Sequence, residues 1–557
     1  MGAGRQRRFV LVDPCLTGLG SHPYHYAAVI LAAAARAGCD RLLVTHRDFT
    51  APLPDVPVLP AFTHTAYSKY TLGGGLDSRP GWRPSWLPQP PWQVGHADRR
   101  RAERTAAFAR EVRPAFDGLA AGDVVLVATA SELEAAGLAR AIAAAEPPPG
   151  VGWHVQYHLP IMTGFAADLP AHAARIAAAR GPLAAALAAA TPHAIHHHAT
   201  TEELAWQYER LVGGPVGVLP YPAQVPATRR HDGAPLRVAC LGDARPEKGS
   251  ASLAAIVAAT AADPELAGRV RFVVQTNRGY PAASRRREHL AVTRSLAALA
   301  RIAAAGGPVE LVAGPLDAAA YAHQLATADI ALLPYDQDRY RCRCSGVVLE
   351  ALAGGLVPIV TGGGWMARQF ATPIEAHAAA VRAAAEVGEP RRLVRPLVGR
   401  RPLLVEPPAG PETAGAWTAA VVEVAWDGAA DEWLSLPPVR VAVAGGTRPP
   451  TVLAAGTAGV ATAVFPLPPR ARPLVELTAA CPGRPAMPAA VTIRTVRTGG
   501  PVPASAVGLV IAAAADSAAA IREVVRHADH YRATAAAHAA TVRRAATADE
   551  VVRRLLS

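Results

Sequence analysis

Short apolar runs alternate with longer segments of helical character over roughly the first two fifths of the chain. The runs end at glycine, proline or charged residues and have the length of buried strands. They lie at residues 8–14, 40–46, 122–129 and 152–158. Strands and helices that alternate in this way are typical of a parallel, doubly wound sheet. The pattern predicts one such domain over residues 1–219.

The same alternation begins again after a proline-rich stretch. Residues 220–235 combine prolines with polar residues, so we interpret them as a linker. Further strand-like runs follow at residues 236–243, 270–277, 309–314, 329–335 and 357–363. We therefore expect a second doubly wound domain over residues 236–399.

The pattern changes to short runs of β-type residues between residues 400 and 502. Glycine and proline turns separate these runs, which favours an antiparallel β-sandwich. From residue 503 onward the chain returns to one apolar run followed by helical segments, which are too few for a core of their own. We interpret residues 400–502 as an insertion into the second α/β domain, and residues 503–557 as the completion of that domain.

Composition limits the class of protein and of partner. The 557-residue chain is too long for one core, and 51% hydrophobic against 18% charged residues indicates a globular protein. Its net charge of +12 favours anionic partners such as nucleotides or lipid headgroups. The arginines are scattered and no aromatic-basic signature accompanies them, so we expect no nucleic-acid partner.

Cysteine usage and hydropathy predict a reduced, cytoplasmic protein. Six cysteines without a C-x-x-C pair do not form a disulfide framework, and the C-x-C pair Cys342 and Cys344 lacks a second pair that would complete a zinc site. We find neither a signal-peptide core nor an uncharged apolar stretch of about 18 residues. The net charge leaves peripheral contact with the inner membrane open.

A loop after the first strand of the second domain carries candidate chemistry. In LGDARPEKGS (residues 241–250), Gly242 allows a tight turn, while Arg245 and Lys248 supply positive charge beside a helix start. Helix N-terminal amides and cations both favour a bound anion, so the loop suits a diphosphate. A solvated charged turn is the alternative interpretation.

A second candidate follows a later strand of the same domain. Ser345 and Gly346 begin a short helix that holds Glu350 among Val347 and other apolar residues. A carboxylate in such a place needs a partner to offset its desolvation. That partner is either a loop arginine, which is a structural role, or the hydroxyl groups of a ligand.

The first domain contributes a glycine loop and histidines. Gly18 and Gly20 let the backbone approach a ligand closely, and His158 ends a predicted strand at the same sheet edge. The run HHH at residues 196–198 invites a metal interpretation. Adjacent strand residues point to opposite faces, so these three side chains cannot converge on one ion.

The two loops together resemble a known family. GDARPEKG (residues 242–249) and ADIALLPYD followed by SGVVLEALAGGLVPIVT (residues 328–361) resemble the retaining glycosyltransferases of the GT-B fold, family 4 type. The resemblance is strongest over residues 236–368, weaker over 8–220 and 503–557, and absent over 400–500. It implies two facing Rossmann-like domains, the inserted β-rich domain being additional.

The resemblance also implies an activity of the hexosyltransferase type, as in polysaccharide biosynthesis. A sugar would pass with retention from a nucleotide-sugar donor to a glycan, lipid-linked or other acceptor, without a metal or other cofactor. In similar enzymes the residues that match Arg245 and Lys248 hold the diphosphate, and the one that matches Glu350 binds the ribose. The resemblance assigns catalytic roles to His158, Arg245, Lys248 and Glu350. It assigns contacts with the donor to Arg245, Lys248 and Glu350, and also to Gly18, Gly20, Gly242, Ser345, Gly346 and Val347.

This chain departs from the family pattern at the first glutamate of the E-x7-E motif, where Cys342 stands. That departure keeps open an alternative, a non-catalytic glycan- or nucleotide-binding protein on a degenerate GT-B scaffold. We expect Arg339, Arg341 and Arg343 to lie near the diphosphate, with the two cysteines on the opposite side. The D-x-D at residues 336–338 resembles a metal-binding motif of the other glycosyltransferase fold, but here it lies inside a GT-B motif, so we expect no metal.

Overall fold

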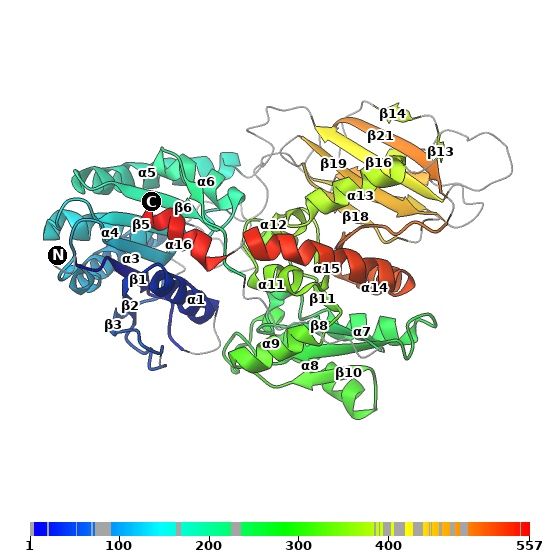
Figure 1. Ribbon diagram of the computed structural model, residues 1–557, viewed down its shortest axis with the longest axis horizontal. Coiled ribbons are helices and arrows are strands. Elements are labelled where there is room, and N and C mark those ends of the chain that lie inside the picture. Colours follow the sequence, from blue (N-terminus) through cyan, green and yellow to red (C-terminus); the bar gives the residue numbers. More distant parts are fainter. Residues whose placement is uncertain are drawn as a thin grey trace.

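The structure is a computed structural model of the 557-residue chain. It describes residues 5–18, 22–51, 53–67, 71–72, 91–162, 169–223, 235–383, 386–388, 390–393, 403–405, 418–426, 438–444, 446, 448–455, 459–467, 474–479, 488–498, 500–545 and 547–557. Figure 1 shows a first α/β unit at the left, a second α/β unit at the lower right, and a β-rich unit above the second.

The first unit is built on a seven-stranded, all-parallel sheet with the order β3-β2-β1-β4-β5-β6-β7. Its central strands are buried on both faces, which explains why they read as continuous apolar runs. The strands are β1 (Arg8–Asp13), β2 (Asp40–His46), β3 (Val58–Phe62), β4 (Val124–Ala130), β5 (Gly152–Tyr157), β6 (Ile195–Ala199) and β7 (Gly217–Val218). The helices are α1 (His22–Arg36), α3 (Pro91–Glu111), α4 (Glu132–Ala145), α5 (Leu169–Ala189) and α6 (Glu202–Val212).

The second unit repeats this topology with six parallel strands in the order β10-β9-β8-β11-β12-β22. The strands are β8 (Leu236–Cys240), β9 (Val270–Gln275), β10 (Val309–Val312), β11 (Ile330–Leu333), β12 (Val357–Thr361) and β22 (Leu509–Ile511). The helices include α7 (Leu253–Ala262), α8 (Arg287–Ala304), α9 (Ala318–Ala326), α10 (Gln337–Tyr340), α11 (Gly346–Gly354), α12 (Trp365–Arg368) and α13 (Ala371–Ala383). The prediction of two units with parallel sheets is confirmed.

Two antiparallel sheets lie between α13 and β22 in the chain, and they share one apolar core that includes Phe465 and Leu477. One sheet contains β13 (Glu386–Val387), β14 (Arg391–Leu393), β16 (Ala419–Trp426), β19 (Val460–Pro466) and β21 (Pro488–Arg497). The other contains β15 (Leu403–Val405), β17 (Val439–Ala444), β18 (Thr451–Leu453) and β20 (Leu474–Ala479). Because β13 and β14 already pair with β21, the β-rich unit begins before residue 400, where we had placed its boundary.

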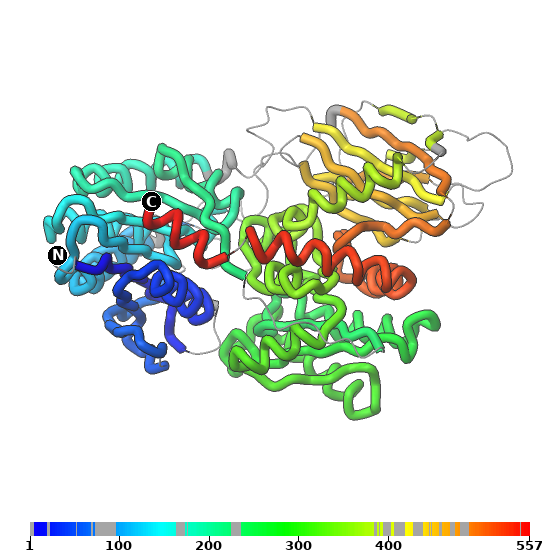
Figure 2. The backbone as a smooth tube through the Cα atoms, in the orientation of Figure 1, coloured from blue at the N-terminus to red at the C-terminus, as the bar shows by residue number. Residues whose placement is uncertain are grey.

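The chain then returns to the second unit and crosses to the first. Strand β22 pairs in parallel with β12, and α14 (Ser517–Arg526), α15 (Ala528–Ala545) and α16 (Ala548–Leu556) follow. Figures 1 and 2 show these helices running from the second unit to the first, where α16 lies beside α1. Val551, Val552 and Leu555 are buried there, and Asp549 pairs with Arg36.

Further contacts join the two α/β units directly. A single apolar cluster contains both Tyr26 of α1 and Val348 of α11. Arg368 of the second unit forms an ion pair with Glu203 of the first. The helices that make these contacts, α1, α6, α11 and α12, follow the carboxyl ends of strands in the two sheets, which is where parallel α/β sheets bind their ligands. Among the described residues, no helix combines the length and hydropathy needed to cross a membrane.

Candidate functional site

Two glycines shape the loop that follows β8. Gly242 has a φ of +96° and its amide donates a 2.7 Å hydrogen bond to Gln275 Oε1. Gly249 ends the 3-10 helix η3 (Pro246–Lys248) with a φ of +72°. A Cβ at Gly249 would lie 2.1 Å from the carbonyl oxygen of Pro334, so a side chain is excluded there. The loop therefore turns tightly against the neighbouring strand-end loop.

Lys248 folds back over the start of this loop. A Cβ at Gly242 would lie 2.6 Å from Lys248 Nζ, and that ammonium is 6.0 Å from the ring centroid of Tyr335. Burial, followed by the charge of Arg245, lowers the pKa of Lys248 to about 8. The structure thus places the ammonium group in a desolvated position at the carboxyl end of β8, with Glu350 near enough to influence it.

Arg245 is engaged by its own loop. Its Nη2 donates a 2.6 Å hydrogen bond to Asp243 Oδ2, and its Nη1 lies 4.0 Å from Glu247 Oε1. Asn277 also donates a hydrogen bond to Asp243. A Cβ at Gly279 would lie 2.5 Å from Arg245 Nε, so the loop after β9 packs against the guanidinium. A ligand anion would therefore compete with Asp243 for Arg245.

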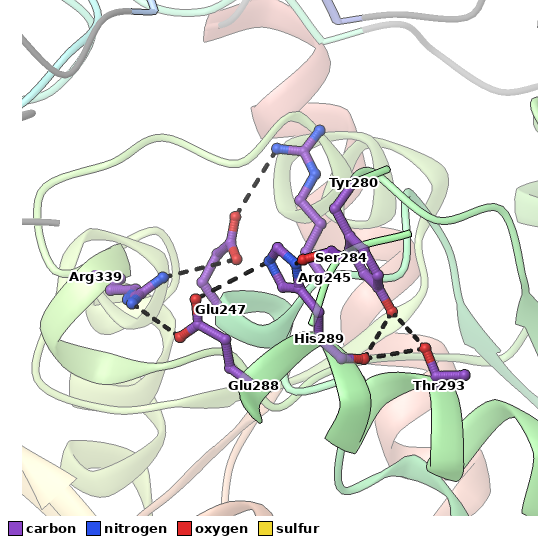
Figure 3. Close-up of polar contacts among 8 residues, drawn as sticks. All are labelled: Arg245, Glu247, Tyr280, Ser284, Glu288, His289, Thr293 and Arg339. Carbon is purple, nitrogen blue, oxygen red and sulfur yellow. Dashed lines mark hydrogen bonds and ion pairs between the residues drawn. The ribbon is translucent and has the colours of Figure 1, made fainter. Parts of the chain in front are cut away.

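A network of polar contacts continues from Arg245 to α8 and α10 (Figure 3). Arg339 of α10 lies 3.4 Å from Glu288 and 4.0 Å from Glu247. His289 accepts or donates a 2.6 Å hydrogen bond with Ser284 Oγ, and the ring of Tyr280 stacks on it at 4.1 Å. This network joins three strand-end loops. Arg339 is engaged in this network, and its expected position near a diphosphate stays a prediction.

Glu350 lies on α11 with 8% of its surface exposed. Tyr321 Oη of α9 donates a 2.6 Å hydrogen bond to Glu350 Oε2. Burial raises the pKa of Glu350 to about 7, while Tyr321 and then Lys248 oppose that shift. The partner of this carboxylate is thus a tyrosine, and among the described residues it forms no ion pair with a loop arginine.

The start of α11 lies beside Glu350. Ser345 is the N-terminal flanking residue and is buried, and Val347 packs at the edge of the apolar cluster that joins the two units. A Cβ at Gly346 would lie 3.4 Å from Tyr221 Cε1 and 3.8 Å from Glu350 Oε1. The first-turn amides of a helix favour an anion, so Lys248 and α11 provide positive potential on the same side of β11.

The first unit presents His158 to the second. His158 follows β5 and is half-buried, and its amide donates a 3.2 Å hydrogen bond to the carbonyl of Ala130. Burial, followed by the positive charge of Arg343, lowers the pKa of His158 to about 4. His158 and Arg343 therefore come close across the two units. A Cβ at Gly18 would meet nothing within 4 Å, whereas Gly20 lies outside the described residues.

Cys342 is buried at the contact between the two units. Only 1% of its surface is exposed, its Sγ lies 3.8 Å from the carbonyl oxygen of Met162, and burial raises its pKa to about 11. Cys344 is also buried. Arg341 is 8% exposed, and its expected position near a diphosphate stays a prediction. The main chain of Arg341 packs closely against Gly364. A Cβ added at Gly364 would lie 2.7 Å from Arg341 Cα.

Two sets of residues suggested a metal site, the D-x-D at residues 336–338 and the histidines at residues 196–198. Asp336 caps α10 by accepting a 3.0 Å hydrogen bond from the amide of Arg339. His196 and His198 stack on His154 on one face of the sheet, while His197 meets Tyr157 on the other. The predicted opposite orientation of adjacent histidines is confirmed. Among the described residues, no group of three or more His, Cys, Asp or Glu side chains is arranged to hold a metal ion.

Several residues beside Lys248 and Glu350 belong to no motif that we recognised. These are aromatic or amide side chains from other elements: Tyr221, Gln275 and Tyr321. A tyrosine or histidine inside a helix has no distinctive spacing, so the sequence carries no signal that separates these residues from ordinary core residues.

Comparisons with known proteins place the chain beside several solved structures. No family model matches it, and no curated protein matches it. A trehalose-6-phosphate phosphatase N-terminal domain from Candida albicans has a TM-score of 0.44 at 13% identity, over 67% of this chain and 86% of that chain. The sucrose-phosphate synthase of Thermosynechococcus elongatus has a TM-score of 0.40 at 14% identity, over 66% and 84%. WaaG, a glycosyltransferase involved in lipopolysaccharide biosynthesis, has a TM-score of 0.38 at 14% identity, over 66% and 84%.

Proposed function

We propose that this protein is a retaining glycosyltransferase that moves a sugar from a nucleotide-sugar donor to a glycan, lipid-linked or other acceptor. The observation that carries the proposal is the convergence of Lys248 and Glu350, each influencing the pKa of the other, at the carboxyl ends of β8 and β11. A cation and a carboxylate in one desolvated site suit the two ends of a nucleoside diphosphate, its phosphates and its ribose hydroxyls.

The identity of the cation supports this assignment. The sequence contains 56 lysines and arginines, and only Lys69 and Lys248 are lysines, which leaves 54 arginines. Although arginine outnumbers lysine so strongly in this chain, the loop after β8 carries a lysine, Lys248. A compact ammonium fits over Gly242, where a planar guanidinium is larger and more rigid.

In the proposed reaction the bond between the anomeric carbon and the diphosphate breaks, and negative charge develops on the diphosphate. Lys248 and the first-turn amides of α11, near Ser345, Gly346 and Val347, would stabilise that charge. Glu350 would accept a hydrogen bond from a ribose hydroxyl. His158 would face the transferred sugar from the first unit. Because positive charge of the protein itself meets the diphosphate, this scheme uses no metal.

The test is to incubate the protein with a panel of nucleotide sugars and simple acceptors and to measure the release of nucleoside diphosphate. Lys248→Ala and Glu350→Ala are expected to abolish release with an unchanged circular dichroism spectrum. Arg301→Ala, on the exposed end of α8, serves as the matched charge control. Full activity of both site variants would overturn the assignment, and the anomeric configuration of the product, read by NMR, tests retention.

A second candidate is a protein that binds a nucleotide or glycan without turnover. The burial of Cys342 favours it, because the position that carries a carboxylate in the family pattern here holds a neutral thiol turned toward the first unit. Binding of a nucleoside diphosphate without release from any nucleotide sugar would favour this candidate over the transferase.

A further inference from the structure

Tyr321 restrains the carboxylate of Glu350 from a separate helix. Its hydroxyl donates a 2.6 Å hydrogen bond to Oε2, which fixes the side of the carboxylate that faces α9. The other oxygen, Oε1, faces Gly346. A Cβ added at Gly346 would lie 3.8 Å from Oε1. The carboxylate therefore presents one oxygen toward the start of α11 and keeps the other against α9.

A residue of the other α/β unit packs on this tyrosine. The ring of His25, on α1, stacks on the ring of Tyr321 with a centroid distance of 6.4 Å and an interplanar angle of 26°. His25 is itself contacted edge-on by Tyr24, which packs against Phe49. The position of Tyr321 thus depends on both units, whereas Glu350 belongs to the second unit alone.

We propose that Tyr321 is a positioning residue that presents Glu350 to a ligand hydroxyl, and that His25 makes this positioning depend on contact between the two units. The inference rests on the proposed function, because it takes Glu350 as the acceptor of a hydrogen bond from the nucleotide. Neither residue needs to touch the ligand. Their effect is transmitted through the orientation and ionisation of one carboxylate.

The groups around Glu350 predict a distinctive pH dependence. Tyr321 faces it from α9, Lys248 from η3 and Tyr221 from the segment after β7, while His25 of α1 reaches it only through Tyr321. Burial raises the pKa of Glu350 to about 7, and the hydroxyl of Tyr321 opposes that rise. Removing the hydroxyl raises the pKa further, so more of the carboxyl is protonated at neutral pH and is a weaker hydrogen-bond acceptor for the ligand.

The experiment measures binding of UDP, GDP and ADP by calorimetry between pH 6.5 and 9. Tyr321→Phe keeps the ring that packs on His25, and we expect it to bind roughly tenfold more weakly than the wild type at pH 7, with this ratio to the wild type shrinking toward pH 9. His25→Asn removes the ring that stacks on Tyr321 but leaves the Tyr321 hydroxyl in place. We therefore expect several-fold weaker nucleotide binding with an unchanged pH midpoint. Tyr531→Phe is the matched control, since it removes a hydroxyl that another tyrosine, itself in ring contact with a histidine, His530, donates to a buried glutamate, Glu523.

The outcomes separate this inference from the proposed function. If Glu350→Gln weakens binding but Tyr321→Phe and His25→Asn both match the wild-type protein at every pH, the positioning role is wrong and the nucleotide site stands. If Glu350→Gln also binds as tightly as the wild type, or if no nucleoside diphosphate binds, the proposed function fails first. A Tyr321→Phe defect that is equal at pH 7 and pH 9 contradicts the ionisation part of the argument.

Discussion

The hydroxyl of Thr201 donates a 2.8 Å hydrogen bond to the main-chain carbonyl of Cys342 and so joins the two α/β units. Thr201 also caps α6 by accepting a 3.1 Å hydrogen bond from the amide of Leu204. One side chain thereby joins the start of a helix in the first unit to the loop that precedes α11 in the second. The segment that departs from the family motif is therefore the segment that the first unit holds in place.

Restoring a glutamate at Cys342 is expected to harm the protein. The new carboxylate would be buried and would lie near Glu203, whose charge already acts on the thiol. We expect Cys342→Glu to lower the free energy of unfolding by about 3 kcal/mol or more, measured by urea denaturation, and Cys342→Ser to cost less. A Cys342→Glu variant as stable as the wild type would show that this buried position tolerates a carboxylate.

The lowered pKa of Lys248 predicts selective acylation. At pH 8 a side chain with a pKa of about 8 is half deprotonated, which makes it on the order of a hundredfold richer in free amine than an ordinary lysine. We expect a small acylating reagent to modify Lys248 preferentially, as read by peptide mass spectrometry, and saturating nucleoside diphosphate to slow the reaction. Labelling at the same rate with and without nucleotide would show that the lysine does not face the ligand.

Gly242→Ala tests the contact between the loop and Lys248. Its φ of +96° disfavours alanine, and the added Cβ would lie 2.6 Å from Nζ. We expect loss of about 1 kcal/mol in the free energy of unfolding and roughly tenfold or greater loss of nucleoside diphosphate affinity. Gly268→Ala is the control, because its φ is +72° but a Cβ there meets nothing within 4 Å. Equal nucleotide affinity in both variants would contradict a role for this contact.

Acid should lower the folding stability of the protein through the buried histidines of the first unit. His154 Nδ1 lies 3.0 Å from His198 Nε2, His154 also bonds to the main chain of Leu555, and burial lowers the pKa values of the two rings to about 3 and about 4. Since the unfolded pKa is about 6.5, the unfolded state takes up protons first, and stability falls as pH drops from about 6.5 toward 4.

His154→Gln removes one of these histidines. We expect the loss of unfolding free energy between pH 7.5 and pH 5 to shrink by roughly 2 kcal/mol relative to the wild type, measured by urea denaturation. The exposed His323, changed to glutamine, is the control. An unchanged pH slope in His154→Gln would show that the histidine pair does not resist protonation.

Much of the fold could be predicted because its signals are local. Runs such as residues 8–14 and 357–363 are mostly apolar, since strands in a parallel sheet are covered on both faces. The turn at Gly242 and the short helix that begins at Gly346 follow from glycine and apolar spacing in the same way. Alternation of such segments determined the two parallel sheets, and the change to short β-type runs determined that a β-rich unit interrupts the second.

Only the tertiary structure decided which side chains meet. The sequence places Arg245 in a loop that suits a diphosphate. In the folded chain its guanidinium is hydrogen-bonded to Asp243 and packs against Gly279. The sequence also leaves the partner of Glu350 open between an arginine and a ligand. In the structure its hydrogen-bond partner is Tyr321. The physical reason is that strand and helix periodicity depends on neighbours along the chain, whereas hydrogen bonds and burial depend on groups brought together from distant segments.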